Sequence, residues 1–205
     1  METLFDFLVK IDKNAFLFIN AKSGTYPLVD SAAKIIASDY LIPVSFSLIL
    51  VLIWCRGGSL KLQIEGRSAV LKSISTLLCA CFVVFILNEI AFRDRPYTLP
   101  DARLIFYAPT DSSFPSNSVA AVAGMAIPIF RTYRVLGIIM LIGSFSLGVG
   151  RIFVGIHFPG DVIGGSLIAI VSFWIIGRLF YIFDKQIIYL ILLFEKSKWL
   201  KIFRI

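Results

Sequence analysis

One histidine and one aspartate stand at a spacing that suits nucleophilic or proton-transfer chemistry. His157 is the only histidine in the sequence, and Asp161 follows it by four residues, with Pro159 and Gly160 between them. A Pro-Gly pair favours a turn and then a helix start, so the carboxylate is expected near the imidazole, where it would fix the ring tautomer. A histidine serves as a nucleophile or base near neutral pH. The structural alternative is an interfacial histidine followed by a helix-capping aspartate.

Two arginines are candidates for binding an anionic substrate. Arg95 precedes Pro96, and Arg151 follows an apolar stretch in which an unpaired charge is costly. The guanidinium group presents a rigid fork of donors that suits phosphate. Arg93 is a weaker candidate of the same kind. For each arginine, the alternative is a side chain that reaches out of the bilayer to the lipid headgroups.

A serine-rich run at 112–118 is typical of a loop that leads into a helix amino terminus. The free backbone N–H groups of such a terminus bind anions, and the hydroxyl groups of Ser116 and Ser118 would add donors. An ordinary capping serine is the structural alternative. Each of these clusters has such an explanation when it is taken alone.

The elements that carry these residues are predicted to be membrane helices of a single domain over 1–205. The chain is 58% hydrophobic, whereas soluble domains are roughly 45–50% apolar. The net charge of +7 indicates basic residues at cytoplasmic loops and membrane surfaces rather than a nucleic-acid partner. Membrane lipids are the expected surroundings, and no protein partner is implied. A single histidine does not favour a zinc site.

Five apolar runs approach the roughly 20 residues that a spanning helix needs. The third is short and the fourth is glycine-rich, so both must pack against neighbours. Residues 3–20 and 186–204 mix apolar and charged positions and are predicted to be interfacial amphipathic helices, with a sixth span at either end as the alternative. The sequence thus predicts an all-α, polytopic transmembrane helix bundle with spans at 38–55, 69–92, 116–130, 135–152 and 161–183.

The basic residues predict the orientation of the bundle. The 56–72 loop, the 131–134 link and the tail from Lys185 are rich in lysine and arginine. With five spans, these three segments lie on one side, which the positive-inside rule makes cytoplasmic. The loops 93–115 and 153–160 then share the outer side. One anion bound there would explain the arginines, the serine run and the His/Asp pair together.

In order and spacing, these motifs resemble those of the type 2 phosphatidic acid phosphatase family. That family has a lysine, six residues and Arg-Pro, then Pro-Ser-Gly-His, and then Ser-Arg, five residues, His, three residues and Asp. The resemblance covers about 85–165 most strongly. The matching positions are Arg95-Pro96, Pro115-Ser116, Arg151, His157 and Asp161.

The resemblance implies a membrane lipid phosphatase that requires no metal or other cofactor. His157 would attack phosphorus and form a phosphohistidine, Asp161 would orient and polarise the ring, and water would then release phosphate. The remaining site residues would hold the phosphoryl oxygens through the transition state. These are Asn88, Arg93, Arg95, Ser116, Asn117, Ser118 and Arg151.

Three positions depart from the family pattern. The family lysine falls at Asn88, so one phosphate-binding charge is missing, and Arg93 would replace it in part. The serine before the third-motif arginine is Gly150. The second-motif histidine, which is thought to protonate the leaving group, is Ser118. Serine does this inefficiently near neutral pH.

The missing acid points to the class of substrate. General acid catalysis is typically worth about 10²–10⁴-fold, and a lipid alkoxide needs it, whereas a phosphate leaving group with a pKa near ~6 needs far less. We therefore expect a polyprenyl diphosphate, as for the undecaprenyl pyrophosphate phosphatases of the family, at the outer face of a bacterial plasma membrane. The alternatives are a lipid monophosphate (lipid A 1-phosphate, phosphatidylglycerol phosphate or phosphatidate) and a non-catalytic lipid-phosphate binder or transporter.

The predicted orientation can be tested with a reporter domain fused after Ile205. The reporter should lie in the cytoplasm, because the tail is predicted on the same side as the two basic loops. Paired fusions to a cytoplasm-active and an exterior-active reporter give the location. A reporter found outside would mean that the span count is wrong and that the site faces inward.

Overall fold

The computed structural model describes residues 4–196, and every regular element in that range is helical. The prediction of an all-α protein is confirmed. One short 3₁₀ turn, Pro96–Thr98, interrupts the long loop between α4 and α5. The α-helices are α1 (Leu4–Asn20), α2 (Pro27–Ala37), α3 (Leu41–Cys55), α4 (Leu60–Ile90), α5 (Asn117–Thr132), α6 (Arg134–Phe153), α7 (Pro159–Ile182) and α8 (Asp184–Lys196).

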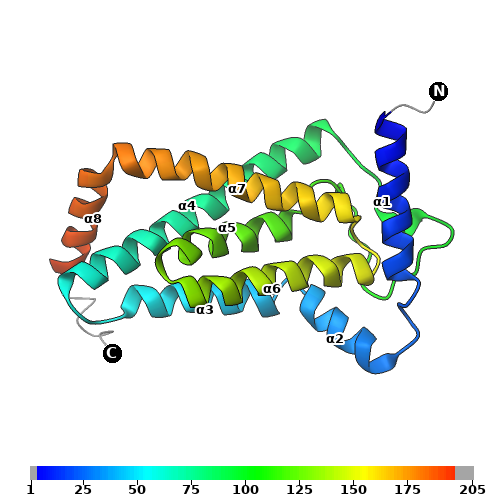
Figure 1. Ribbon diagram of the computed structural model, residues 1–205, viewed down its shortest axis with the longest axis horizontal. Helices are drawn as coiled ribbons and strands as arrows, with labels where there is room; N and C mark the ends of the chain where they lie inside the picture. Colours follow the sequence, from blue (N-terminus) through cyan, green and yellow to red (C-terminus); the bar gives the residue numbers. More distant parts are fainter. Residues whose placement is uncertain (1–3, 197–205) are drawn as a thin grey trace.

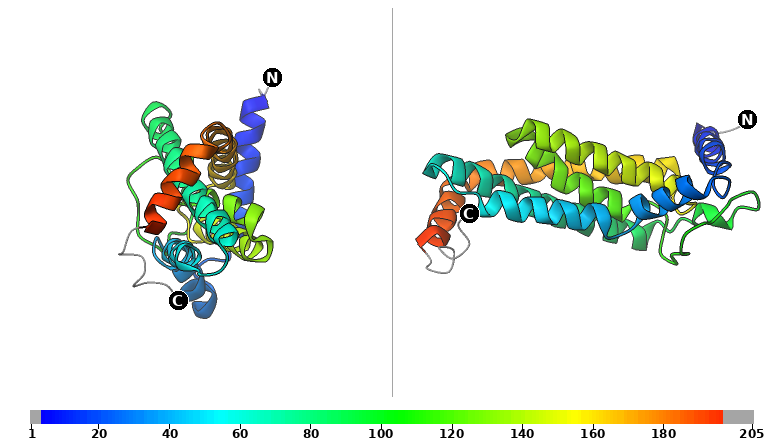
Figure 2. Two further views of the ribbon diagram at one scale, coloured as in Figure 1. Left: turned by 90° about the vertical axis from the view of Figure 1, so that its left-hand side faces the viewer. Right: turned by 90° about the horizontal axis from the view of Figure 1, so that it is seen from below.

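Helices α3 to α7 run lengthwise and form a bundle, whereas α1 and α8 lie across its two ends (Figure 1; Figure 2). Helix α5 occupies the centre, where it packs against α4, α6 and α7. Small residues allow these helices to approach closely: a Cβ atom on Gly124 of α5 would lie 3.2 Å from the Cα atom of Leu77 in α4. Such small-residue contacts are the usual way that helices pack in a membrane.

Three helices are long and apolar enough to cross a membrane, namely α4, α6 and α7. Helices α2 and α3 together make a fourth candidate, bent by 47° at the break between them. Large apolar side chains such as Leu78, Phe82 and Phe85 are exposed on α4, and exposed apolar patches of this size fit contact with lipid. The chain is therefore an integral membrane protein with three or four candidate spans.

Helices are present at all five predicted spans, but two of them are shorter than a full crossing. Helix α5 has 16 residues, which gives about 24 Å at 1.5 Å per residue, against a hydrocarbon core of about 30 Å. Helix α3 begins at Leu41 rather than residue 38. Helix α2 lies at 27–37, where the sequence does not predict a helix, because eleven residues that include Asp30 and Lys34 form no long apolar run.

The amphipathic helices predicted at the termini correspond to α1 and α8. Helix α1 spans nearly the whole of the predicted 3–20. Helix α8 begins at Asp184 and covers the first part of the predicted 186–204. The rest of that segment, 197–204, lies outside the described residues.

Two loops meet at one end of the bundle, beside α1 and α2, and we call this the loop end. Residues 91–116 join α4 to α5 there, and residues 154–158 join α6 to α7 (Figure 1). The link between α5 and α6 at Tyr133 and the link between α3 and α4 lie at the opposite end (Figure 1). The loops that carry the predicted site residues therefore do share one end.

Gly165 allows the start of α7 to rest directly on the start of α5. A Cβ atom at this position would lie 2.5 Å from the carbonyl oxygen of Ser116, so Gly165→Ala must push the two helices apart. Overpacking of this kind costs about 1–3 kcal/mol. We expect a lower melting temperature for the variant in detergent, measured by thermal unfolding.

Gly177→Ala, on the same helix, is the matched control. Nothing lies within 4 Å of a Cβ atom built on Gly177. Because alanine favours helix over glycine by up to ~1 kcal/mol, this variant should be as stable as the wild type or slightly more so. Equal melting temperatures for the two variants would contradict the packing argument.

Candidate active site

His157 is buried in the loop between α6 and α7, with one ring nitrogen hydrogen-bonded to the backbone and the other facing a pocket. Its Nδ1 atom lies 2.9 Å from the carbonyl oxygen of Ser113. A carbonyl oxygen only accepts hydrogen bonds, so Nδ1 carries the proton. The lone pair is then on Nε2, which lies 3.4 Å from Nη1 of Arg95. The ring therefore presents the unprotonated Nε2 to the pocket.

Asp161 is fully buried at the first turn of α7 and binds the groups that hold His157 in place. Its Oδ2 atom accepts from the Ser113 hydroxyl at 2.5 Å and from the backbone N–H of Phe158 at 2.7 Å. The same oxygen lies 3.6 Å from Nδ1 of His157. The two side chains are close, as the Pro-Gly turn predicts, but the direct partner of Nδ1 is the Ser113 carbonyl, which the sequence analysis does not identify.

Arg93 connects Asp161 to the amino-terminal helix. Its Nη1 donates to Oδ1 of Asp161 at 2.7 Å, and its Nη2 donates to Oδ2 of Asp12 in α1 at 2.6 Å. The guanidinium also lies 4.1 Å from the centre of the Phe158 ring, and Asp12 accepts from the backbone N–H of Gly160 at 2.7 Å. Arg93, predicted as a phosphate ligand, is placed as the partner of two carboxylates and does not line the pocket.

Arg95 lies beside His157 and is held by the loops around it. Its Nη1 donates to the carbonyl oxygen of Ile156 at 2.9 Å. Its Nε and Nη2 donate to the backbone carbonyl and the carboxylate of Asp111, at 3.0 and 2.8 Å. The guanidinium is therefore fixed within reach of any group bound at Nε2 of His157.

Arg151, in the last turn of α6, faces the same pocket and pairs with Asp39. Asp39 lies in the break between α2 and α3. One of its oxygens accepts from the Ser118 hydroxyl at 3.2 Å, and the other accepts from the Tyr107 hydroxyl at 2.7 Å. Neither Asp39 nor Tyr107 is a sequence-predicted site residue.

The pocket between these side chains has a volume of about 160 Å³. Pockets for whole drug-sized ligands are about 300–1,000 Å³, so this one suits a headgroup rather than a lipid chain. Five predicted site residues line it: Arg95, Asn117, Ser118, Arg151 and His157. Asp39, Tyr107 and Asp111 also line it, whereas Asn88 on α4 does not.

Three predicted phosphate ligands carry buried polar atoms that are left without a partner within residues 4–196. One is an acceptor, Oδ1 of Asn88, and two are donors: Oγ of Ser116, at the amino-terminal cap of α5, and Nε of Arg151. Buried polar atoms are normally hydrogen-bonded. An anion at the start of α5 would supply oxygen acceptors to both donors.

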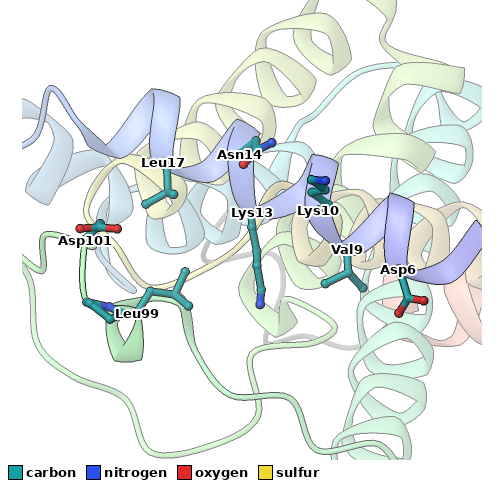
Figure 3. A pocket seen from close by; sticks show the side chains of 9 residues that line it. Asp6, Val9, Lys10, Lys13, Asn14, Leu17, Leu99 and Asp101 are labelled. Atoms are coloured by element: carbon teal, nitrogen blue, oxygen red, sulfur yellow. The ribbon is translucent and has the colours of Figure 1, made fainter. Parts of the chain in front are cut away.

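A larger hollow of about 380 Å³ lies between α1 and the turn at 99–101 (Figure 3). It is lined by side chains of α1, among them Lys10 and Lys13, and by Leu99 and Asp101. It contains none of the motif residues, so size does not identify the reactive site.

The carboxylates near the site form salt bridges with arginines. Asp12 and Asp161 share Arg93, while Asp39 pairs with Arg151 and Asp111 pairs with Arg95. Within the described residues 4–196, no three His, Cys, Asp or Glu side chains come together in a way that could hold a metal ion. The groups that gather here suit an anion.

The surroundings favour the neutral form of His157. Burial lowers the pKa of its imidazole below the usual 6.5, and the positive charges of Arg95 and Arg151 act in the same direction. Asp161 opposes them by favouring the cation. Burial and the hydrogen bond to Asp39 raise the pKa of the Tyr107 hydroxyl above its usual 10.0. At neutral pH the imidazole is neutral, with its proton on Nδ1, and the phenol keeps its proton.

Comparison with known proteins identifies the family. Residues 69–185, more than half of the chain, match the sequence profile of the PAP2 superfamily. The chain belongs to the PAP2 superfamily. The resemblance of its motifs to the type 2 phosphatidic acid phosphatases is thereby confirmed.

Relatives of this PAP2 protein include enzymes and solved structures. Undecaprenyl-diphosphatase BcrC of Bacillus subtilis (strain 168) is 29% identical over 169 residues, 82% of each chain. The crystal structure of Aquifex aeolicus LpxE superposes with a TM-score of 0.63 at 28% identity, covering 80% of this chain and 92% of that one. A PAP2-type phosphatidylglycerolphosphate phosphatase from Bacillus subtilis, 18% identical with a TM-score of 0.63 over 88% of each chain, shares the fold. This PAP2 protein is a membrane-embedded lipid phosphatase.

The neutral state of His157 can be measured directly, because a single histidine gives one set of imidazole resonances in a labelled sample. We expect its pKa below 6.5, for the reasons given above. In Asp161→Asn, the group that favours the cation is lost, so the pKa should fall further. NMR titration of both proteins in detergent tests this, and a value above 6.5 in the wild type would contradict it.

Proposed function

We propose that this PAP2 protein removes the terminal phosphate of a polyprenyl diphosphate through a phosphohistidine at His157. The observation that carries the proposal is the orientation of the imidazole. The Ser113 carbonyl holds Nδ1 at 2.9 Å, and Nε2 faces the pocket beside Arg95. A nucleophile with a fixed tautomer next to phosphate-binding groups is what covalent phosphoryl transfer requires.

In the first step, Nε2 of His157 forms a bond to the terminal phosphorus. The bond from phosphorus to the bridging oxygen breaks, its electron pair stays on that oxygen, and the polyprenyl monophosphate leaves. The proton stays on Nδ1, which donates to the Ser113 carbonyl throughout. The ring is then a phosphorylated cation, and the carboxylate of Asp161, 3.6 Å from Nδ1, stabilises its positive charge.

Arg95, Arg151 and the start of α5 would hold the phosphoryl oxygens during this step. Oγ of Ser116 and Nε of Arg151 are buried donors that lack a partner among the described residues, and they supply contacts of the required kind. Asn117 and Ser118 line the same pocket and add the free N–H groups of a helix amino terminus. Asp161 and Arg93 position the nucleophile from the Nδ1 side of the ring, away from the pocket.

The leaving group supports a diphosphate as the substrate. Ser118 stands where a histidine would act as the acid, and a serine hydroxyl is a poor proton donor. A phosphate leaving group, with a pKa near ~6, departs without much help. The relative that matches 82% of the chain is named an undecaprenyl-diphosphatase, which favours the same substrate class.

We place the loop end outside the cytoplasm of a bacterium. The opposite end carries Arg56, Arg131 and Arg134 at the ends of α3, α5 and α6, which supports a cytoplasmic position by the positive-inside rule. Helix α5 would then cross as the buried fifth helix of the bundle. The headgroup would occupy the pocket, while the polyprenyl chain stays in the bilayer against exposed apolar side chains near the loop end, such as Ile90 and Ile163.

The substrate class is testable with purified protein in a phosphate-release panel. The panel contains a polyprenyl diphosphate and three monophosphates, namely lipid A, phosphatidylglycerol phosphate and phosphatidate. We expect the highest kcat/KM for the diphosphate, by about 10²-fold or more if proton donation limits the others. His157→Ala is the control and should abolish release from all of them.

Faster turnover of a monophosphate would overturn the substrate assignment but leave the phosphatase chemistry intact. Unchanged release by His157→Ala would overturn the phosphohistidine route itself.

A further inference from the structure

The second half of the reaction needs a base. Once the phosphoryl group is on Nε2 of His157, a water molecule must attack phosphorus and lose a proton. His157 is then occupied by the phosphoryl group and cannot accept that proton. Positioned general bases accelerate such steps by about 10²–10⁴-fold. A second proton-accepting group in the pocket would therefore speed this step.

Five side chains other than His157 that line the pocket qualify on chemical type, and four of them are poor bases in this setting. Ser112 and Ser118 have neutral hydroxyl groups. Tyr107 keeps its proton at neutral pH because burial and the hydrogen bond to Asp39 raise its pKa. Asp111 is largely exposed and binds Arg95 through both its side chain and its backbone carbonyl. The remaining group is Asp39.

Contacts made by Asp39 keep it in the carboxylate form. It pairs with Arg151 and accepts hydrogen bonds from the hydroxyl groups of Tyr107 and Ser118. Each of these donors stabilises the anion. Its side chain is about half exposed, with a relative accessibility of 44%, so it lies at the mouth of the pocket, where water enters.

The backbone around Asp39 explains how a carboxylate reaches this place. Residues 38–40 form the break between α2 and α3, so Asp39 projects from the bend rather than from a helix face. Helix α2 rests on α6 at Gly150, where an added Cβ atom would lie 3.4 Å from the backbone nitrogen of Ala37 and 3.3 Å from Ile36. This close approach, one residue before Arg151, brings the bend against the pocket.

We infer that Asp39 is the general base that activates water for hydrolysis of the phosphohistidine. The water oxygen forms a bond to phosphorus while its proton passes to the Asp39 carboxylate. The bond from phosphorus to Nε2 breaks, and its electron pair returns to His157 as the neutral imidazole. The proton on Asp39 then leaves to solvent or with the released phosphate. This inference rests on the phosphohistidine route of the proposed function.

Asp39→Asn is the decisive variant, because it keeps the size of the side chain and removes the base. We expect phosphorylation to proceed, with a burst of about one lipid monophosphate per enzyme. Steady-state phosphate release should then fall about 10²–10⁴-fold. Substrate labelled with ³²P at the terminal phosphate should leave a phosphoenzyme that is stable to alkali and labile to acid. The burst also shows that the variant is folded.

Two further variants separate proton transfer from a positioning role. Asp111→Asn removes the other pocket carboxylate that pairs with an arginine, and it should not accumulate phosphoenzyme. The double variant Asp39→Asn, Ser118→His places an imidazole beside residue 39, because the Ser118 hydroxyl oxygen lies 3.2 Å from Oδ1 of Asp39. It should restore steady-state release by about tenfold or more, since a histidine can act as the base. A residue that only positions Arg151 would not be rescued in this way.

The results distinguish failure of this inference from failure of the proposed function. If the wild type forms no phosphoenzyme during turnover, the phosphohistidine route is wrong. If the wild type forms the phosphoenzyme, two results would show that Asp39 is not the base. One is that Asp39→Asn turns over at the wild-type rate, and the other is that it loses the burst together with steady-state phosphate release. Asp39→Glu retains a carboxylate and should keep the rate of dephosphorylation within about tenfold of the wild type. A loss of rate equal to that of Asp39→Asn would also contradict the inference.

Discussion

A carboxylate buried at the end of an apolar bundle is stable only if every one of its oxygen atoms is satisfied. Asp161 meets this requirement by drawing on several separate parts of the chain. It accepts from the Ser113 hydroxyl in the long loop, from the backbone N–H of Phe158 before α7 and from Arg93 after α4. Arg93 then recruits Asp12 from α1. The loop end takes its form from the need to satisfy this one charge.

The position of His157 follows from the same requirement. Ser113 binds Asp161 through its side chain and His157 through its backbone carbonyl. The residue that satisfies the buried carboxylate therefore also fixes which nitrogen of the imidazole carries the proton. Stability and reactivity meet in one serine, because the energetic cost of burying Asp161 keeps the acceptor for Nδ1 in place.

Sequence reasoning succeeds where the relevant geometry is local or is set by helix topology. The separation of His157 and Asp161 is four residues across a Pro-Gly turn, so their closeness is largely determined by the chain itself. Arg95 and Arg151 meet because loops at the same end of antiparallel helices must lie together, which the apolar runs already predict. Ser118 and Asn117 reach the pocket because they begin the helix that runs down the middle of the bundle.

The role of a side chain is not predictable from the sequence when its partner is brought to it by tertiary packing. Arg93 is as good a phosphate ligand as Arg95 by residue type, but its partner Asp12 comes from a helix 81 residues away, and no periodicity reveals that pairing. Asp39 is one acid at the boundary of an apolar run, where it is indistinguishable from a helix cap. A backbone acceptor such as the Ser113 carbonyl leaves no trace in residue type. Length and composition identify three or four candidate spans among the described helices rather than the predicted five, since α5 has only 16 residues and packs between α4, α6 and α7.

The pairing of both pocket arginines with carboxylates has a consequence for how a phosphate group enters. Arg151 already holds Asp39, and Arg95 already holds Asp111, so an incoming headgroup does not meet bare cations. The headgroup must displace the carboxylates of Asp39 and Asp111, which belong to the protein and therefore remain close to the arginines. In the proposed reaction, binding would then be an exchange of one anion for another, and the return of the carboxylates would help to expel inorganic phosphate, an ion that two unpaired arginines would release slowly.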